Sequence, residues 1–431
     1  MGKVISDMHA KVESRHFPAY PRRRFWWIIG PGLLSGTSGN DPSAVTAYAD
    51  DGAIVGYGHL WLILLSTLFY QAVQFACAKI GRISQKGLPL LLREHYGHPA
   101  AVFASSLLIV TNVTLIGADL AAIGSGLQLI TGIPYVWFVI PTGVVLWYLT
   151  VYYNFEAFKK IFLFMSLVFI AYILTSLVSH VDWKAVMVST CMPHLDFTFN
   201  GISSTVALLG ATISPYSMFW QAQGEIEQQR FGSLKQQVQT AKIDVTSGTV
   251  SGNLVAYFIV ISTSATLYAH HMTIKTAAEA ARALEPLAGP LAGYLFALGL
   301  IGSGLVAIPV LLVSTSYAVV GAAGWRPSGL SKCLSQARGF YFVLTSALVS
   351  GLGIALLEID PIQLIFWANV IAAIMAPPLV IAILLIGNNR AIMKDQRLSL
   401  LHNIGLVLII LILIGAVTLL FYSMATGQSN N

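Results

Sequence analysis

The stretch IIGPGLLSGTSGNDPSAVTAY, residues 28–48, decides how the fold is interpreted. It has the length and apolar character of a membrane-spanning helix, yet four glycines and two prolines interrupt it. Proline removes a backbone donor, and glycine lowers the cost of unwinding. The pattern therefore predicts a helix that breaks near Ser38 to Pro42. Inside a membrane, the backbone groups freed by a break are tolerated only where they line a cavity or bind something.

Asp41 stands at this expected break. An ionisable residue near the middle of a membrane is expensive, so it points to a functional site by default. A carboxylate beside freed backbone carbonyls suits a cation. The alternative is a proline kink in which Asp41 does no more than hydrogen-bond to a neighbour.

The composition of the whole chain agrees with a membrane protein. Of its 431 residues, 56% are hydrophobic and only 10% are charged. The apolar residues fall in long runs. In lipid the backbone polar groups of such runs can form their hydrogen bonds within a helix, so we expect an all-α fold class. Three cysteines are too few for a disulfide framework, and no phosphate-binding loop, nucleophile elbow or zinc motif is present. We expect no cofactor and no enzymatic activity. The net charge of +6 reports topology and contact with anionic lipid rather than nucleic acid.

Apolar windows predict about eleven spans. They start near residues 26, 60, 101, 136, 161, 202, 245, 291, 340, 362 and 401. With the N-terminus in the cytoplasm, all of the 24 Lys and Arg residues except Lys184, Lys275 and Arg282 lie on the inner side. We therefore expect a basic cytoplasmic segment (1–24) and one multi-pass domain (25–431) in the plasma membrane, the inner membrane if the source is bacterial. We also expect the C-terminus to lie outside.

A second apolar span is interrupted around Ser214-Pro215, where Leu208-Leu209-Gly210-Ala211-Thr212 echoes the approach to Asp41-Pro42. Each half then holds about five helices, and an odd number inverts the second half relative to the first. This predicts an inverted repeat with halves at about 25–181 and 200–386 and an extra helix at about 400–423. Such a layout is typical of secondary transporters.

These motifs resemble the Nramp family of divalent-metal transporters. The resemblance is carried by Gly30-Pro31-Gly32-Leu33-Leu34 leading to Asp41-Pro42, by Gly117-Ala118-Asp119-Leu120-Ala121, by Gly210-Ala211-Thr212 before Ser214-Pro215, and by Ala368-Asn369-Val370 to Pro377. It implies a LeuT-like fold with unwound first and sixth helices. It also implies metal as the substrate, held between them.

The chain departs from the family motifs at the positions that would touch the metal. The first-helix motif of the family reads Asp-Pro-Gly-Asn, and here Ala44 replaces its asparagine; the sixth reads Met-Pro-His, and here Ser214 and Tyr216 replace its methionine and histidine. Sulfur favours softer metals, whereas oxygen ligands suit Mg²⁺ and Mn²⁺. The chain thus resembles the Nramp-related magnesium transporters. The expected ligands are Asp41, Ser38, Asn40, Ala211, Ser214 and Asn369. For Asn369 and Asn40, and for Thr212 and Ser217, a hydrogen bond between helices is the equal alternative.

Asp119 is a second intramembrane acid. The family resemblance places this position, with an arginine that Arg338 matches, in a proton pathway. The family's nearby glutamate is Ala122 here and its histidine is Tyr216, so we expect weak or absent proton coupling. Asp119 and Arg338 are expected to form an ion pair with either a gating or a structural role.

Other acidic residues receive simpler interpretations. Asp50 and Asp51 are expected to form a solvated outer rim, and Glu225 and Glu227 its inner counterpart.

Three functions stay open at this point. The first is alternating-access transport of Mg²⁺, Mn²⁺ or both. The second is transport of a small organic solute on the same LeuT-like fold. The third is a non-transporting receptor on that scaffold. The expected partners are the metal ion and the lipid bilayer, without nucleic acid; the sequence leaves the oligomeric state open, with a monomer plausible.

Overall fold

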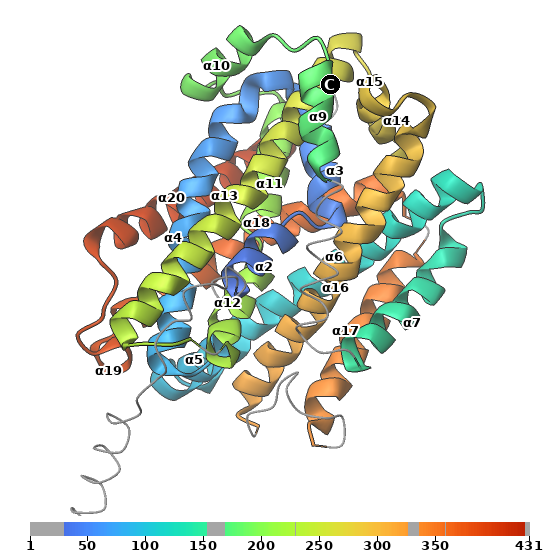
Figure 1. Ribbon diagram of the computed structural model, residues 1–431. Helices are drawn as coiled ribbons and strands as arrows, with labels where there is room; N and C mark the ends of the chain where they lie inside the picture. The colour runs from blue at the N-terminus through green and yellow to red at the C-terminus, as the bar shows by residue number, and fades with distance from the viewer. Residues whose placement is uncertain (1–29, 153–168, 229, 326–335, 358, 427–431) are drawn as a thin grey trace, which may run out of the picture.

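A computed structural model describes residues 30–152, 169–228, 230–325, 336–357 and 359–426, and every regular element within these ranges is a helix. Figure 1 shows long helices running between two ends of the molecule, with α10, α14 and α15 at one end and α5 and α19 at the other. This confirms the all-α fold class. The expected basic segment 1–24 lies outside the described residues.

Helices occur at or near each expected span start that falls in the described residues. The long helices are α4 (Leu60–Ser84), α6 (His98–Thr131), α7 (Val136–Tyr152), α13 (Leu234–Thr266), α16 (Ala292–Ala323), α17 (Arg338–Ala355), α18 (Pro361–Asn388) and α20 (Leu400–Ala425). By length and composition, seven stretches of the described chain could cross a membrane. The broken sixth span misses this threshold because its halves have 14 and 13 residues. The expected span near residue 161 falls partly in 153–168, outside the described residues.

The shorter elements make the interrupted spans and the connections. They are α2 (Pro31–Ser38), α3 (Pro42–Val55), η2 (Gly56–His59), α5 (Leu88–Tyr96), α9 (Ile170–Val178), α10 (Trp183–Cys191), α11 (Phe199–Thr212), α12 (Pro215–Glu227), η4 (Tyr268–His270), α14 (Ala277–Ala281), η5 (Arg282–Leu284), α15 (Glu285–Ala288), η6 (Gly289–Leu291) and α19 (Arg390–Met393). Both expected breaks are therefore present, one between α2 and α3 and the other between α11 and α12.

Helix α13 begins eleven residues before the expected span start at Val245. Its first turns are polar, so an apolar window could not detect them. A capping box, in which Ser233 and Gln236 satisfy each other's backbone amides, starts the helix at Leu234. The polar turns therefore extend α13 beyond its apolar part.

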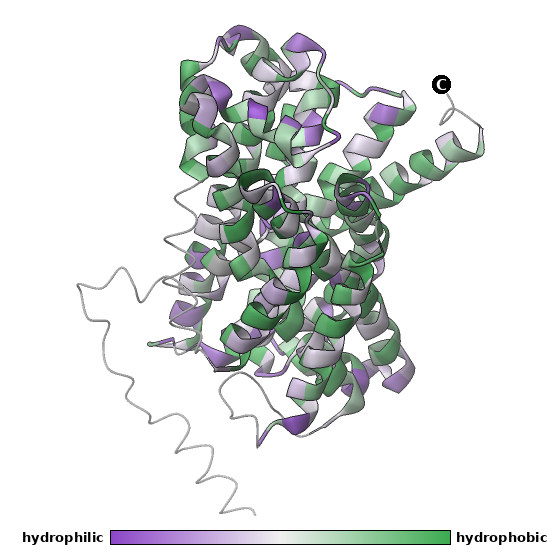
Figure 2. Ribbon diagram, turned by 90° about the vertical axis from the view of Figure 1, so that its right-hand side faces the viewer, coloured by the Kyte–Doolittle hydropathy of each residue, from purple (hydrophilic) through white to green (hydrophobic). Residues whose placement is uncertain are grey.

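Many large apolar side chains are exposed along the molecule. Figure 2 shows much hydrophobic ribbon in green, with the more hydrophilic purple segments gathered toward the two ends. Trp137 is 75% exposed, Phe342 71% and Leu411 60%. A water-soluble surface does not carry large apolar side chains this densely, whereas lipid accepts them. The molecule is built to sit in a bilayer.

Helix α2 packs against α13 through glycines spaced four residues apart on both helices. A Cβ atom at Gly36 would strike the backbone of Gly248, and one at Gly252 would strike the carbonyl oxygen of Gly36. Gly32 meets the backbone of α13 in the same way. Small residues at this spacing let two helix backbones touch, which is a common packing mode in membranes. The first half of the broken first helix is thereby held against α13.

We predict that Gly36→Ala destabilises the protein, because the added methyl group has no space against the α13 backbone. Overpacking of this kind costs about 1–3 kcal/mol. The measurement is the melting temperature of purified protein in detergent. Gly415→Ala in α20 is the matched control, since a Cβ there meets nothing within 4 Å. Equal melting temperatures for the two variants would contradict the prediction.

Candidate substrate site

Asp41 lies in the first break and begins α3. Its carboxylate accepts hydrogen bonds from the Ala44 amide at 2.7 Å and from the Ser43 hydroxyl at 2.8 Å, both through Oδ1. This is an N-cap, with Pro42 at the first helical position where a missing amide costs nothing. The side chain is only 2% exposed. Sequence preferences for helix starts thus explain why a carboxylate is fixed at this depth.

The second break contains Ile213 and Ser214, with Pro215 as the first residue of α12. The Ser214 hydroxyl donates to the Ala211 carbonyl oxygen at 2.9 Å. The Ser214 carbonyl oxygen in turn accepts from the Ser217 hydroxyl at 2.6 Å. The carbonyl groups freed by this break therefore face hydroxyl donors of their own segment. The Ser214 hydroxyl oxygen keeps lone pairs with which it can serve as an acceptor or a ligand.

The two breaks meet at Asp41. The Tyr216 hydroxyl, one residue into α12 from Pro215, donates to Asp41 Oδ2 at 3.2 Å. From α18, the Asn369 amide nitrogen donates to the Ser43 carbonyl oxygen at 3.3 Å. Asp41, Ser214, Tyr216 and Asn369 are all at most 2% exposed. The structure thus brings together expected site residues from three separate parts of the chain.

Ser43 links both intramembrane acids, which the sequence interpretation did not foresee. Its backbone amide donates to Asp119 Oδ1 at 3.0 Å, while its hydroxyl donates to Asp41. Asp119 Oδ2 has no hydrogen-bond partner in the described part of the chain. A signal was available, because Ser43 replaces the glycine of the family motif. Its role depends on the approach of α6 and α18, which no local pattern reveals.

The expected ion pair between Asp119 and Arg338 is wrong. Asp119 is fully buried in the middle of α6, whereas Arg338 is exposed as the first residue of α17. Within the described ranges, the ion pairs do not include these two residues. The helix-end position of Arg338 explains the error. Asp119 instead accepts a hydrogen bond from the backbone amide of Ser43.

Other expected ligands make helix-to-helix or local hydrogen bonds. The Asn40 amide nitrogen donates to the Gly252 carbonyl oxygen of α13 at 3.1 Å, which ties the first break to that helix. The Thr212 hydroxyl donates to the Leu208 carbonyl oxygen at 2.8 Å within α11. The Ser217 hydroxyl accepts from Gln74 of α4 at 2.6 Å. The side chain of Ser38 lies outside the described part of the structure.

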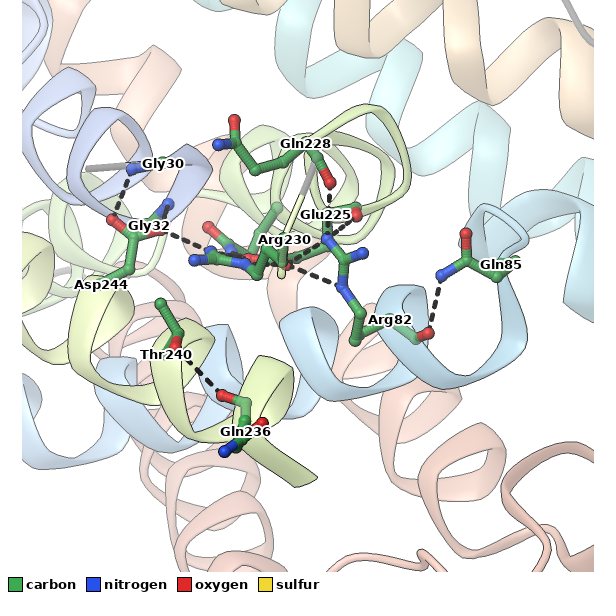
Figure 3. Close-up of polar contacts among 11 residues, drawn as sticks. Gly30, Gly32, Arg82, Gln85, Glu225, Gln228, Arg230, Gln236, Thr240 and Asp244 are labelled. Carbon is green, nitrogen blue, oxygen red and sulfur yellow. Dashed lines mark hydrogen bonds and ion pairs between the residues drawn. The ribbon is translucent and has the colours of Figure 1, made fainter. Parts of the chain in front are cut away.

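A second polar cluster lies where α2, α4, α12 and α13 converge, at the start of α2 (Figure 3). Glu225 of α12 is fully buried and pairs with Arg82 Nη2 at 2.9 Å and with Arg230 Nη2 at 2.5 Å. Arg82 also donates to the Glu225 carbonyl oxygen and, at 3.0 Å, to that of Gln228. The expected solvated inner rim is therefore wrong for Glu225, because two arginines from other elements cover it.

Asp244 of α13 extends this cluster to the first half of the broken first helix. Its carboxylate pairs with Arg230 at 2.9 Å and accepts from the backbone amides of Gly30 and Gly32, each at 2.9 Å, and of Leu33 at 3.1 Å. A carboxylate at a helix N-terminus is stabilised by free amides and by the helix dipole. The cluster thus closes the end of α2 against α12 and α13.

Charge compensation distinguishes the two aspartates that cap the halves of the first span. Asp244 has Arg230 beside it. Among the described residues, no Lys, Arg or His forms an ion pair with Asp41 or Asp119. No group of three or more His, Cys, Asp and Glu side chains gathers in that part of the chain either. A cation at Asp41 would therefore be held by one or two carboxylates together with hydroxyl, amide and carbonyl oxygens.

Two broken helices that meet at a buried, uncompensated carboxylate define a membrane transporter scaffold of the LeuT kind. Mhp1, a nucleobase-cation-symport-1 family transporter solved in a closed conformation, has the same fold with a TM-score of 0.61 and 12% identity, covering 92% of this chain and 93% of that one. The family described as natural resistance-associated macrophage protein-like matches residues 32–423. The chain belongs to this Nramp family.

Known relatives are similar to this chain over most of their length. The divalent metal cation transporter MntH of Deinococcus radiodurans is 26% identical over 386 residues, covering 86% of this chain and 84% of that protein. MntH of Caldanaerobacter subterraneus is 24% identical, covering 86% and 87%. The crystal structure of the Eremococcus coleocola manganese transporter superposes with a TM-score of 0.75 at 18% identity, covering 95% of this chain and 89% of that one. The expected family and LeuT-like fold are confirmed.

We predict that Ser43→Ala weakens divalent-cation binding by about tenfold or more, the range for a hydrogen bond to a charged group. The variant removes the hydroxyl that orients Asp41 and keeps the backbone amide that reaches Asp119. Calorimetric titration of purified protein measures the effect, and Ser43→Thr should restore affinity. Ser316→Ala, which removes a buried hydroxyl within α16, is the control. Unchanged affinity in Ser43→Ala would remove Ser43 from the site.

Proposed function

We propose that the chain is a secondary transporter that carries divalent metal cations by alternating access. The observation that supports this most is the buried carboxylate of Asp41, which has oxygen donors around it and no basic partner in the described part of the chain. Burying an uncompensated charge is costly, so a bound cation would supply the positive charge that no neighbouring side chain provides in the described part of the chain. The relatives named above carry divalent-metal or manganese transport in their names.

We further propose Mg²⁺, Mn²⁺ or both as the substrate. Side-chain and backbone oxygens are within reach of Asp41, and Ser214 stands where the family places sulfur. Mg²⁺ keeps several waters when proteins bind it, and small residues at Ala44 and Ser214 leave more room than asparagine and methionine would. Asp41, Ala211, Ser214 and Asn369 are the ligands that we propose, with Ser38 and Asn40 as further candidates through their backbone oxygens.

Weak or absent proton coupling is part of the proposal. Tyr216 occupies the position of the family's histidine, and Ala122 that of its glutamate. Neither residue titrates near neutral pH. We also propose the plasma membrane as the location, with the N-terminus inside and with repeat halves at about 25–181 and 200–386.

The test is flux into proteoliposomes for Mg²⁺ and Mn²⁺, with lumen pH recorded. We predict that Asp41→Ala abolishes uptake while the variant still folds and inserts, because Asp41 is the carboxylate at which the two breaks meet. Asp360→Ala is the matched control, since Asp360 is an exposed N-cap on α18. The lumen should not acidify during metal uptake. Wild-type rates in Asp41→Ala would refute the site, and transport of an organic solute without metal would favour the other LeuT-like substrate class.

A second prediction concerns selectivity. Ser214→Met combined with Ala44→Asn should tighten Mn²⁺ and Cd²⁺ binding and reduce Mg²⁺ transport, because sulfur favours softer ions. Ser214→Leu with Ala44→Asn is the size-matched control without sulfur. Competitive flux and calorimetry measure both. Tight Cd²⁺ binding by the unmodified protein, with no response to Mg²⁺, would contradict the oxygen-ligand argument.

A further inference from the structure

A buried histidine and carboxylate lie outside the candidate substrate site. His59, the last residue of η2, places Nδ1 2.6 Å from Oδ1 of Asp51, which lies on α3. Both side chains are 0% exposed. The expectation that Asp51 belongs to a solvated rim is therefore wrong. The cause is His59, eight residues further along, which folds back over the carboxylate.

Hydrogen bonds also link the pair to α11. The Ser204 hydroxyl donates to Asp51 Oδ1 at 2.5 Å, and the Thr205 hydroxyl lies 3.1 Å from His59 Nε2. Asp51 Oδ2 has no hydrogen-bond partner in the described part of the chain. Helix α3 starts at the first break and α11 ends at the second, and the two helices pack against each other. The cluster therefore lies along the seam that leads from the η2 end of the molecule to Asp41.

The hydrogen bonds around His59 allow its Nε2 atom to be either protonated or unprotonated. Asp51 requires a donor from Nδ1, because a carboxylate only accepts. At Nε2, the Thr205 hydroxyl can accept while its own proton goes to the Gly201 carbonyl oxygen, 2.8 Å away. It can equally rotate and donate to a bare Nε2. The imidazole can thus gain or lose a proton at Nε2 without moving.

We propose that His59 and Asp51 form a proton-binding site that fastens η2 to α11 and makes substrate entry depend on external pH. With the proton bound, an imidazolium faces a carboxylate in a buried setting, where charge-assisted hydrogen bonds are strongest. Without it, only the carboxylate carries charge and the link is weaker. Asp41 is almost fully covered, so entry requires this seam to loosen, and loss of the proton makes that easier. The proton regulates movement without being carried across.

Any test must distinguish the effect of His59 from that of the other titratable groups near η2. They are Asp50 on α3, Tyr57 in η2, Asp182 and Lys184 at the start of α10, His194 and Asp196 before α11, Tyr257 on α13 and Tyr268 in η4. Asp196 adds a further negative charge toward His59. His194 is exposed and lies in the same region, so it serves as a matched histidine control.

Two measurements on the full-length protein test the proposal. The first is the melting temperature in detergent at pH values from about 5 to 8, where histidine titrates. The gap between the unmodified protein and His59→Gln should be largest at the acidic end and should narrow as pH rises. Asp51→Asn should lose the same pH dependence, and His194→Gln should keep it. This measurement needs no transport, so it can succeed even if the proposed function fails.

The second measurement rests on the proposed function and follows Mn²⁺ uptake into proteoliposomes with lumen pH clamped. Uptake by the unmodified protein should rise by about tenfold across that pH range, the ratio for one charge-assisted hydrogen bond. His59→Gln should be fast at every pH, and His194→Gln should follow the unmodified protein. A pH-dependent melting gap with unchanged uptake profiles would overturn the regulatory role. Identical melting profiles for His59→Gln and the unmodified protein would overturn the proton site itself.

Discussion

Both halves of the first span depend on an aspartate that satisfies the backbone amides of a helix start inside the protein. Lipid offers no hydrogen bonds, so amides exposed by a break must find partners in the fold. Asp244 accepts from three amides at the beginning of α2, and Asp41 accepts from one at the beginning of α3. Arg230 compensates the first charge. The second has no basic partner in the described part of the chain, and this asymmetry distinguishes the anchor at Asp244 from the candidate substrate site at Asp41.

The sequence alone predicted the breaks and most of the residues around them. Glycine and proline mark where a helix ends, and an aspartate before proline is a recognisable helix start, so residues 38–42 and 214–215 could be placed from local chemistry. The cluster of Arg82, Glu225, Arg230 and Asp244 could not, because its members come from four segments and each one by itself is typical of a solvated loop. The expected ion pair of Arg338 with Asp119 was wrong for a related reason. Matching a family motif position does not determine how deeply the side chain lies in the fold. The pairing of Asp51 with His59 was not predicted, because only the turn of η2 brings the two residues together.

The cluster around Glu225 bears on how such a protein moves. Buried ion pairs contribute little net stability when both partners are present, but breaking one exposes an uncompensated charge at a cost of about 3–5 kcal/mol. Opening this end of the molecule by moving α2 alone would separate Asp244 from the amides of Gly30, Gly32 and Leu33. Water entering the opening would replace those hydrogen bonds and solvate the charges. Under the proposed alternating access, this cluster would hold its end of the molecule closed while it is dry and would separate once water enters.

Charge also bears on which cation the central site accepts. Asp41 and Asp119 are joined through Ser43, and neither has a basic partner within the described residues. In the proposed site a divalent ion would offset the charge of two carboxylates, whereas a singly charged organic cation would offset only one. Ala44 and Ser214 have smaller side chains than the asparagine and methionine of the family motifs. For the proposed substrate, these two acids with the Ser214 hydroxyl, the Asn369 amide and backbone carbonyls would offer the oxygen ligands that Mg²⁺ and Mn²⁺ prefer.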